Sequence, residues 1–189
     1  VAVLGFALQV PAQVNMGGLK NIERGLSSQL SQRLKEQDAL VVHEQSQVSL
    51  HPDLRNAPSH YTEQLTLSNA ADYAKQAGVQ FVISGVIRDL SLEDPNAFST
   101  SYWSKLKQLT GVTNQYRQFI VDLFVHDGFS GEIVWQKQYS TRGKWQADLA
   151  EQVGFESPSF WSEEYGQQIA LVLKSMASNV TEQIQCQPF

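Results

Sequence analysis

The sequence predicts an α/β fold, bordering on α+β, in which a mixed sheet of about five strands packs against two long helices. Residues 72–85 indicate a short alanine-rich helix that ends at Gly78 and is followed at once by a strand rich in β-branched and aromatic residues. Residues 118–141 indicate two alternating strands around a glycine-containing turn, which is typical of an antiparallel hairpin. Two amphipathic helices, the second over residues 162–185, would cover the sheet.

The N-terminal part alternates strands with the first of these helices. Residues 1–8 form a continuous apolar run, which suits a strand buried on both faces. Leucine and isoleucine then recur at spacings of three and four, which predicts a helix over residues 18–35. A short strand is expected at residues 40–43. Because strands joined by helices favour right-handed crossovers, we expect the first strands of the sheet to be parallel.

The central elements show clearer boundary signals. Ser68 is the expected N-cap of a helix over residues 69–77, and the strand after that helix should cover residues 79–90. The two strands of the hairpin should cover residues 118–126 and 133–141. The hairpin adds antiparallel strands to the parallel ones, so the sheet should be mixed.

Three long irregular stretches interrupt this pattern, over residues 44–67, 91–117 and 142–160. Loops of this length within a compact domain usually serve a function or are mobile. Aromatic side chains gather in them, and two interpretations stay open: the rings pin the loops to the core, or some of them form a contact surface for a partner. The residues of the candidate contact surface are Tyr61, Tyr102, Trp103, Trp145, Phe155 and Trp161.

The composition fits one domain over residues 1–189 with a single core, since 42% of the residues are hydrophobic and 17% are charged. The net charge of −5 arises at the C-terminal end, where residues 145–189 hold six acidic groups and one base. The sequence has no basic patch typical of nucleic-acid binding, and no apolar run approaches the roughly 20 residues of a membrane span. The chain opens at Val1 without an initiator methionine, so we expect a fragment of a longer multi-domain protein.

The motifs that specify a catalytic or cofactor site do not occur. The chain has neither a glycine-rich phosphate loop nor a serine nucleophile elbow, so we expect no enzyme activity and no cofactor. The pair Ser84-Gly85 is better explained by close packing or a bulge in a strand. Cys186, the only cysteine, is either a small apolar residue near a helix end or a thiol whose partner lies outside this segment.

The histidines give no metal-binding pattern. His43, His51 and His60 do not have the spacing of a helical ligand pair, and no cysteine accompanies them, so we expect no metal site. Asp122 and His126 project to the same face of the predicted hairpin strand, which we interpret as a solvated face.

Three segments together resemble the core of the TolB N-terminal-domain-like and CsgG-like group of envelope proteins. They are the opening residues 1–6, the helix-to-strand segment 74–85 and the hairpin 127–135. With its long insertions, the chain is most similar to the middle-domain family of the flagellar assembly protein FlgT.

This resemblance implies a periplasmic component of the H ring around the basal body of a polar, sodium-driven flagellum. It implies contacts with other flagellar ring proteins and stator-associated proteins, self-association into a ring, and a role in stator placement. It implies no catalytic residues. Two alternatives remain: a TolB-like periplasmic adaptor that binds an envelope lipoprotein or another partner, and an enzyme or ligand receptor with an unrecognised site.

Overall fold

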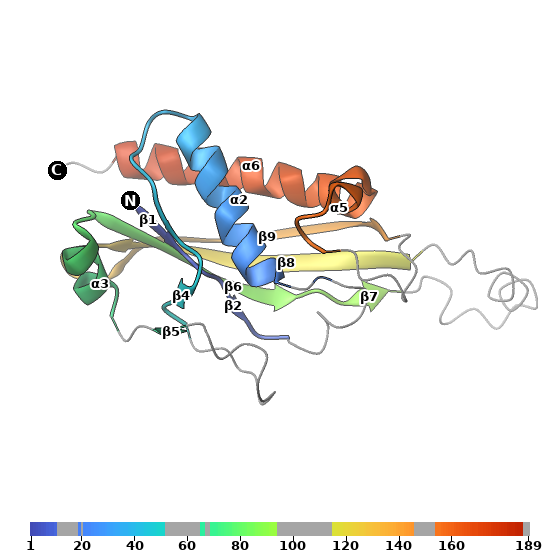
Figure 1. The fold of residues 1–189 in the computed structure, drawn as a ribbon, viewed down its shortest axis with the longest axis horizontal. Helices are drawn as coiled ribbons and strands as arrows, with labels where there is room; N and C mark the ends of the chain where they lie inside the picture. The colour runs from blue at the N-terminus through green and yellow to red at the C-terminus, as the bar shows by residue number, and fades with distance from the viewer. Residues whose placement is uncertain are drawn as a thin grey trace, which may run out of the picture.

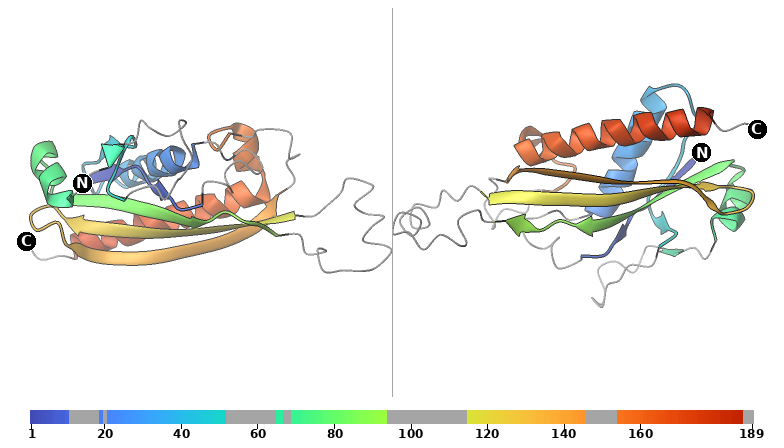
Figure 2. Two further views of the ribbon diagram at one scale, coloured as in Figure 1. Left: turned by 90° about the horizontal axis from the view of Figure 1, so that it is seen from below. Right: turned by 180° about the vertical axis from the view of Figure 1, so that it is seen from behind.

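The computed structural model describes residues 1–10, 19, 21–51, 65–66, 69–93, 115–145 and 154–186. A mixed sheet forms the centre of the molecule, and helices α2 and α6 cover one of its faces (Figures 1 and 2). The described helices are α2 (Ile22–Glu36), α3 (Ala70–Ala77), α5 (Pro158–Ser162) and α6 (Glu164–Gln185). The described strands are β1 (Ala2–Leu4), β2 (Ala7–Leu8), β3 (His43–Gln45), β4 (Val48–Ser49), β5 (Leu65–Thr66), β6 (Phe81–Asp89), β7 (Leu92–Glu93), β8 (Gln115–Asp127) and β9 (Ile133–Trp145).

The sheet has the predicted mixed topology. β1 pairs in parallel with β3 and β6, whereas β6, β8 and β9 form an antiparallel series. Seven of the described strands belong to the sheet, but β2 continues the line of β1 along β6, and β7 continues the line of β6 along β8. The sheet is therefore five strands wide, which confirms the predicted α/β to α+β class. A separate parallel pair, β4 and β5, lies on the other face from α2 and α6 (Figure 1).

The predicted first strand is interrupted at Gly5 and Phe6. Gly5 leaves the pairing with β6, and its N–H donates to the carbonyl of Val48 in β4 at 2.7 Å. The ring of Phe6 then lies against Gly85 in β6, where a Cβ atom would be only 2.7 Å from two ring carbons. The prediction of close packing at Ser84-Gly85 is thereby confirmed.

Two capping positions explain the boundaries of α3. Gly78 has φ +66°, a left-handed conformation that glycine adopts without strain, and it ends the helix as predicted. The N-cap is Asn69, one residue after the predicted Ser68. Its side-chain Oδ1 accepts the N–H of Ala71 at 2.8 Å, which satisfies one of the free amides of the first turn.

The hairpin strands are longer than predicted. β8 begins at Gln115 and β9 ends at Trp145, and these two residues pair with each other. Residues 142–144 are arginine, glycine and lysine, so they do not show the alternation of apolar and polar residues that identifies a strand. The backbone pairing nevertheless continues through them to Trp145. The short helix α5 was not predicted, although Ser157 caps it by accepting the N–H of Phe160 and Pro158 occupies its first turn.

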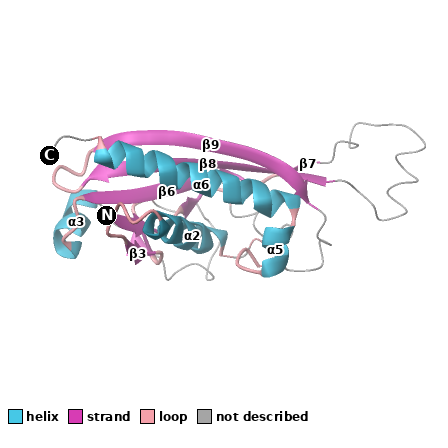
Figure 3. Ribbon diagram, turned by 90° about the horizontal axis from the view of Figure 1, so that it is seen from above, coloured by secondary structure: helices cyan, strands magenta, loops and turns pink. Residues whose placement is uncertain are grey.

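The core consists of two unequal clusters on the two faces of the sheet. The larger one lies between the sheet and the helices α2 and α6, and α6 runs along β8 and β9 (Figure 3). The smaller one joins Leu4 and Val82 of the sheet to Ala70 and Ala74 of α3, with Val48 of β4 packed against it. Side chains on this second face are therefore covered by segments distant in the sequence.

Candidate interaction surface

A buried aromatic cluster fixes α5 and α6 to the ends of β8 and β9. The ring of Trp145 packs edge-on against Tyr165, with centroids 5.6 Å apart, and tilts against Phe160 at 6.1 Å. Phe160 also contacts Phe155, with centroids 4.9 Å apart. Each such pair stabilises by about 0.5–1.5 kcal/mol beyond the burial of its area.

Arg117 places a cation inside this cluster. Its guanidinium carbon lies 5.1 Å from the centre of the Trp145 ring, and its Nε donates to the carbonyl of Leu90 at 3.2 Å. Burial lowers the pKa of Arg117 and raises the pKa of Tyr165, whose hydroxyl donates to the carbonyl of Gln118 at 3.1 Å. The cluster holds the ends of the longest strands against two helices and is a packing feature.

The residues of the predicted contact surface that the structure describes differ in their exposure. Trp145 and Phe155 are each 1% exposed, so the expectation that they lie on an exposed surface is wrong for these two residues. They pin their segments to the core. Trp161 is half-buried and packs edge-on against Phe155, with part of its ring accessible. The remaining three, Tyr61, Tyr102 and Trp103, lie outside the described residues.

The β8–β9 hairpin presents exposed apolar side chains that were not predicted as a surface. Phe129 at its tip is 96% exposed, Ile133 at the start of β9 is 49% exposed, and Val134 is also exposed. We call these three residues the hairpin end. Phe129 is the most exposed of the three, and an exposed aromatic ring is a candidate contact residue.

The turn that carries Phe129 is held rigidly. The carboxylate of Asp127 accepts the N–H of Ser130 at 2.7 Å, and this bond lowers the pKa of Asp127. Gly131 has φ +77°, which favours glycine. The N–H of Gly128 donates to the carbonyl of Gln80 at 2.6 Å, so the turn is also fastened to the start of β6.

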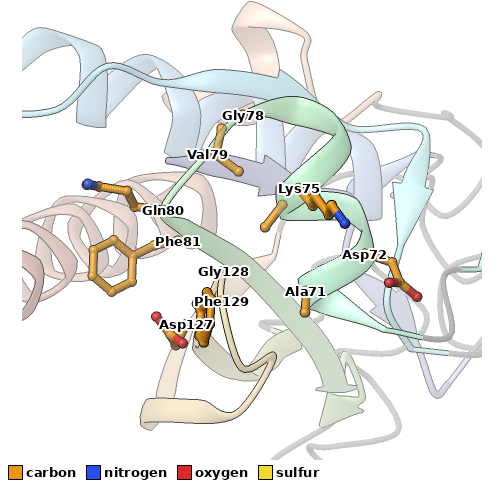
Figure 4. A pocket seen from close by; sticks show the side chains of 11 residues that line it. Ala71, Asp72, Lys75, Gly78, Val79, Gln80, Phe81, Asp127, Gly128 and Phe129 are labelled. Atoms are coloured by element: carbon orange, nitrogen blue, oxygen red, sulfur yellow. The ribbon is translucent and has the colours of Figure 1, made fainter.

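A groove of about 780 Å³ lies between this hairpin and α3. Figure 4 shows Ala71, Asp72 and Lys75 on the helix side and Asp127 and Phe129 on the hairpin side. The segment from Gly78 to Phe81 forms the rest of its wall. Its lining is mainly apolar with a few charged groups, as is usual for a recess that receives a side chain of a partner.

A polar cluster lies on the covered second face of the sheet. The hydroxyl of Ser84 is 3.0 Å from Nε2 of His126 and 3.1 Å from Nε2 of His51. The interpretation of His126 as part of a solvated face is wrong, because the residue is 6% exposed beneath the segment that carries His51. Asp122 retains contact with water and forms an ion pair with Arg88 at 2.7 Å.

The chemistry of this cluster is that of a satisfied polar network. Burial lowers the pKa of both His51 and His126, so both imidazoles are neutral near pH 7. Ser84 is completely buried, so its hydroxyl offers no access to a substrate. Within the described ranges, no group of three or more His, Cys, Asp or Glu side chains is placed to hold a metal ion.

Cys186 is exposed at the C-cap of α6 and forms no disulfide within the described chain. Among all the residues that the structure describes, no helix has the length and apolar character needed to cross a membrane.

The described residues thus define an α+β scaffold domain whose most accessible apolar feature is a hairpin end beside a groove. Residues 1–155 match the model of the family "Flagellar assembly protein T, middle domain", and the chain belongs to this family. The description of the family places its members in flagellar assembly. No curated protein matches the chain.

Several solved structures are similar to this chain at low sequence identity, and those with a TM-score above 0.5 share its fold. The hypothetical protein CT253 from Chlamydia trachomatis is 13% identical with a TM-score of 0.59, and the match covers 98% of this chain and 97% of that one. Protein XCC0632 from Xanthomonas campestris is 5% identical with a TM-score of 0.54, over 97% of this chain and 84% of that one. Lipoprotein GNA1162 from Neisseria meningitidis is 10% identical with a TM-score of 0.47, over 99% of both chains.

Proposed function

We propose that this domain is a non-enzymatic structural component of a periplasmic flagellar basal-body ring, the H ring. It supports ring assembly and stator placement through contacts with ring proteins, stator-associated proteins and further copies of itself. The observation that carries this proposal is the family match over residues 1–155. The architecture agrees with it, because a sheet covered by two long helices gives a rigid body.

The hairpin end is the contact that we assign first within this proposal. Burying the ring of Phe129 against a partner contributes about 1.5–3 kcal/mol, which is a large share of the energy of a typical interface. The ring needs little rearrangement to be presented, because the turn around it is already fixed by Asp127 and by the bond from Gly128 to Gln80. A rigid anchor loses less conformational entropy on binding than a flexible one.

The aromatic residues of the irregular stretches supply the remaining proposed contacts. Trp161, within α5, is half-buried and packs edge-on against Phe160. Tyr61, Tyr102 and Trp103 remain predicted members of the same set.

A basal-body reconstitution with the full-length protein tests the proposal. Phe129→Glu, combined with Ile133→Glu and Val134→Thr, should abolish incorporation into purified basal bodies and motility. The free energy of unfolding should change little, since all three side chains are exposed. Leu171→Glu, at an exposed apolar position on the outer side of α6, is the matched control and should retain incorporation.

Normal rings with the hairpin variant and with charge reversals in all three irregular stretches would overturn the proposal. A pull-down from envelope extract separates it from the adaptor alternative. Ring proteins captured by the wild type and lost with the hairpin variant support the ring role. A lipoprotein captured in their place supports the adaptor role.

A further inference from the structure

The cluster of Ser84, His51 and His126 connects two parts of the molecule that are far apart in the chain. Ser84 lies in β6 and His126 in β8, whereas His51 follows β4 directly. His51 is also in ring contact with Phe124 of β8, with centroids 5.1 Å apart. We call residues 48–51 the His51 arm. The imidazole of His51 is the polar contact that fixes the end of this arm to the sheet.

The hydrogens of this cluster have one consistent arrangement. The carbonyl of Gly131 can only accept, so the nearby Nδ1 of His126, at 3.4 Å, is the donor. Nε2 of His126 is then an acceptor and receives the hydroxyl hydrogen of Ser84. The oxygen of Ser84 in turn accepts the Nε2 hydrogen of His51. The bond from the Ser84 hydroxyl to Nε2 of His126 exists only while His126 is neutral.

A proton added to either ring disrupts the arrangement. On His126 it would occupy Nε2, so that two N–H donors would converge on the oxygen of Ser84 unless His51 changed to the tautomer whose Nε2 accepts the buried hydroxyl. On His51 it would create a cation in a partly buried place, within the field of His126 and of Arg88. With both rings charged, two cations would stand with centroids 6.5 Å apart.

The other ionisable groups near the cluster do not cancel this effect. Arg88 is already paired with Asp122, so that carboxylate is engaged. Asp127 follows His126, but its carboxylate binds the turn at Ser130 and stays ionised, since its pKa is lowered. On the α3 side, Tyr73 packs on the neighbouring cluster and stays neutral, since burial raises its pKa.

We propose that this cluster is an acid-sensitive switch that releases the His51 arm from the sheet. The arm is the part that moves, because within the described chain its two-residue strand β4 pairs with the two-residue β5, and a single backbone bond, from Gly5 to Val48, joins the start of the arm to the line of β1. His126, in contrast, lies within thirteen-residue β8, which is paired on both sides. Release would expose the sheet beneath the arm, including Ser84, which is otherwise completely buried.

Hydrogen exchange of the backbone amides tests this switch, and the test is independent of the proposed ring function. Protection of residues 49–51, corrected for intrinsic exchange rates, should fall between about pH 7.5 and about pH 5. The fall should be roughly tenfold for each unit by which the two histidine pKa values lie below that of a free histidine. Protection of the central residues of β8 should stay constant. Unchanged protection of the arm would refute the switch.

Two variants make the test specific to His51. His51→Gln cannot titrate, and its amide can donate to Ser84 or, when His126 is protonated, turn its oxygen to accept the Ser84 hydroxyl, so its arm should stay protected at both pH values. His43→Gln removes an exposed histidine on β3 and should leave the pH response intact. Should the first variant fail to fold, an NMR titration of the wild type decides. The chemical shifts of the two imidazoles and of the His51 amide must then change with the same midpoint pH, and different midpoints would refute the switch.

Discussion

The close contact between Gly85 and Phe6 gives a quantitative test of the packing between β1, β2 and β6. A Cβ atom built on Gly85 would lie 2.7 Å from Cδ2 and Cε2 of Phe6 and 2.9 Å from its Cγ. Because Cγ is close to the backbone and the ring is completely buried, rotation of the side chain cannot relieve the contact. Gly85→Ala should therefore lower the free energy of unfolding by about 1–3 kcal/mol, the usual cost of overpacking.

The effect of Gly85→Ala on the free energy of unfolding should change sign when the Phe6 ring is removed. Phe6→Ala alone should cost about 3–5 kcal/mol, since it leaves a cavity in the larger core cluster. In that background Gly85→Ala meets no ring, and it should stabilise by about 0.4–1 kcal/mol because alanine restricts the unfolded chain. The coupling energy of the double-mutant cycle should thus be about 1.4–4 kcal/mol.

Urea unfolding of the four proteins of the cycle, followed by tryptophan fluorescence, measures this coupling. Gly154→Ala is the control, since its Cβ would meet no atom within 4 Å and its φ lies outside the left-handed region. It should be neutral or slightly stabilising. An equal effect of Gly85→Ala in the presence and absence of the Phe6 ring would refute the assignment of the contact.

Three further predictions concern the cap, the aromatic cluster and pH. Asn69→Ala removes the N-cap of α3 and should cost about 1 kcal/mol, and an unchanged urea midpoint would contradict the capping role. Trp145→Ala should cost about 3–5 kcal/mol in the same assay, whereas a loss below about 1 kcal/mol would show that the ring is not a core residue. The pKa values of His51 and His126 are lowered in the folded state, so the unfolded chain binds more protons just below pH ~6.5 and stability should fall as the pH drops through that range. A flat pH profile down to about pH 5 would contradict both shifts.

The elements with local signals were predictable from the sequence. Alternation identified β8 and β9, and the glycine after the alanine-rich helix identified its end at Gly78. The ends of elements that form only because they pair with a distant segment of the chain could not be predicted in this way. Residues 142–144 of β9 do not continue the alternation and form a strand because they pair with the long β8, so Trp145 was assigned to a loop, and whether it was buried or part of a contact surface stayed open.

The polar cluster shows the same limitation. The alternating pattern predicted that the side chain of His126 lies on the face of β8 that points away from the main core. This prediction was right, since the neighbouring side chain of Val125 belongs to the larger core cluster. The inference of a solvated face failed because the His51 arm, from a stretch without any regular pattern, covers that face. A signal was available in Ser84, a hydroxyl within the otherwise apolar run of residues 81–87, because a buried hydroxyl requires a polar partner from elsewhere in the chain.

The hairpin end differs from both cases, because nothing in the fold requires its apolar character. The turn is closed by Asp127, by Gly131 and by the bond between Gly128 and Gln80, and none of these uses the side chain of Phe129. A polar residue at that position would satisfy the turn equally well. An aromatic ring that is 96% exposed on a rigid support, beside a mainly apolar groove, adds nothing to the stability of the isolated chain. Under the proposed function its contribution is to binding, so the strongest test of that function lies at Phe129.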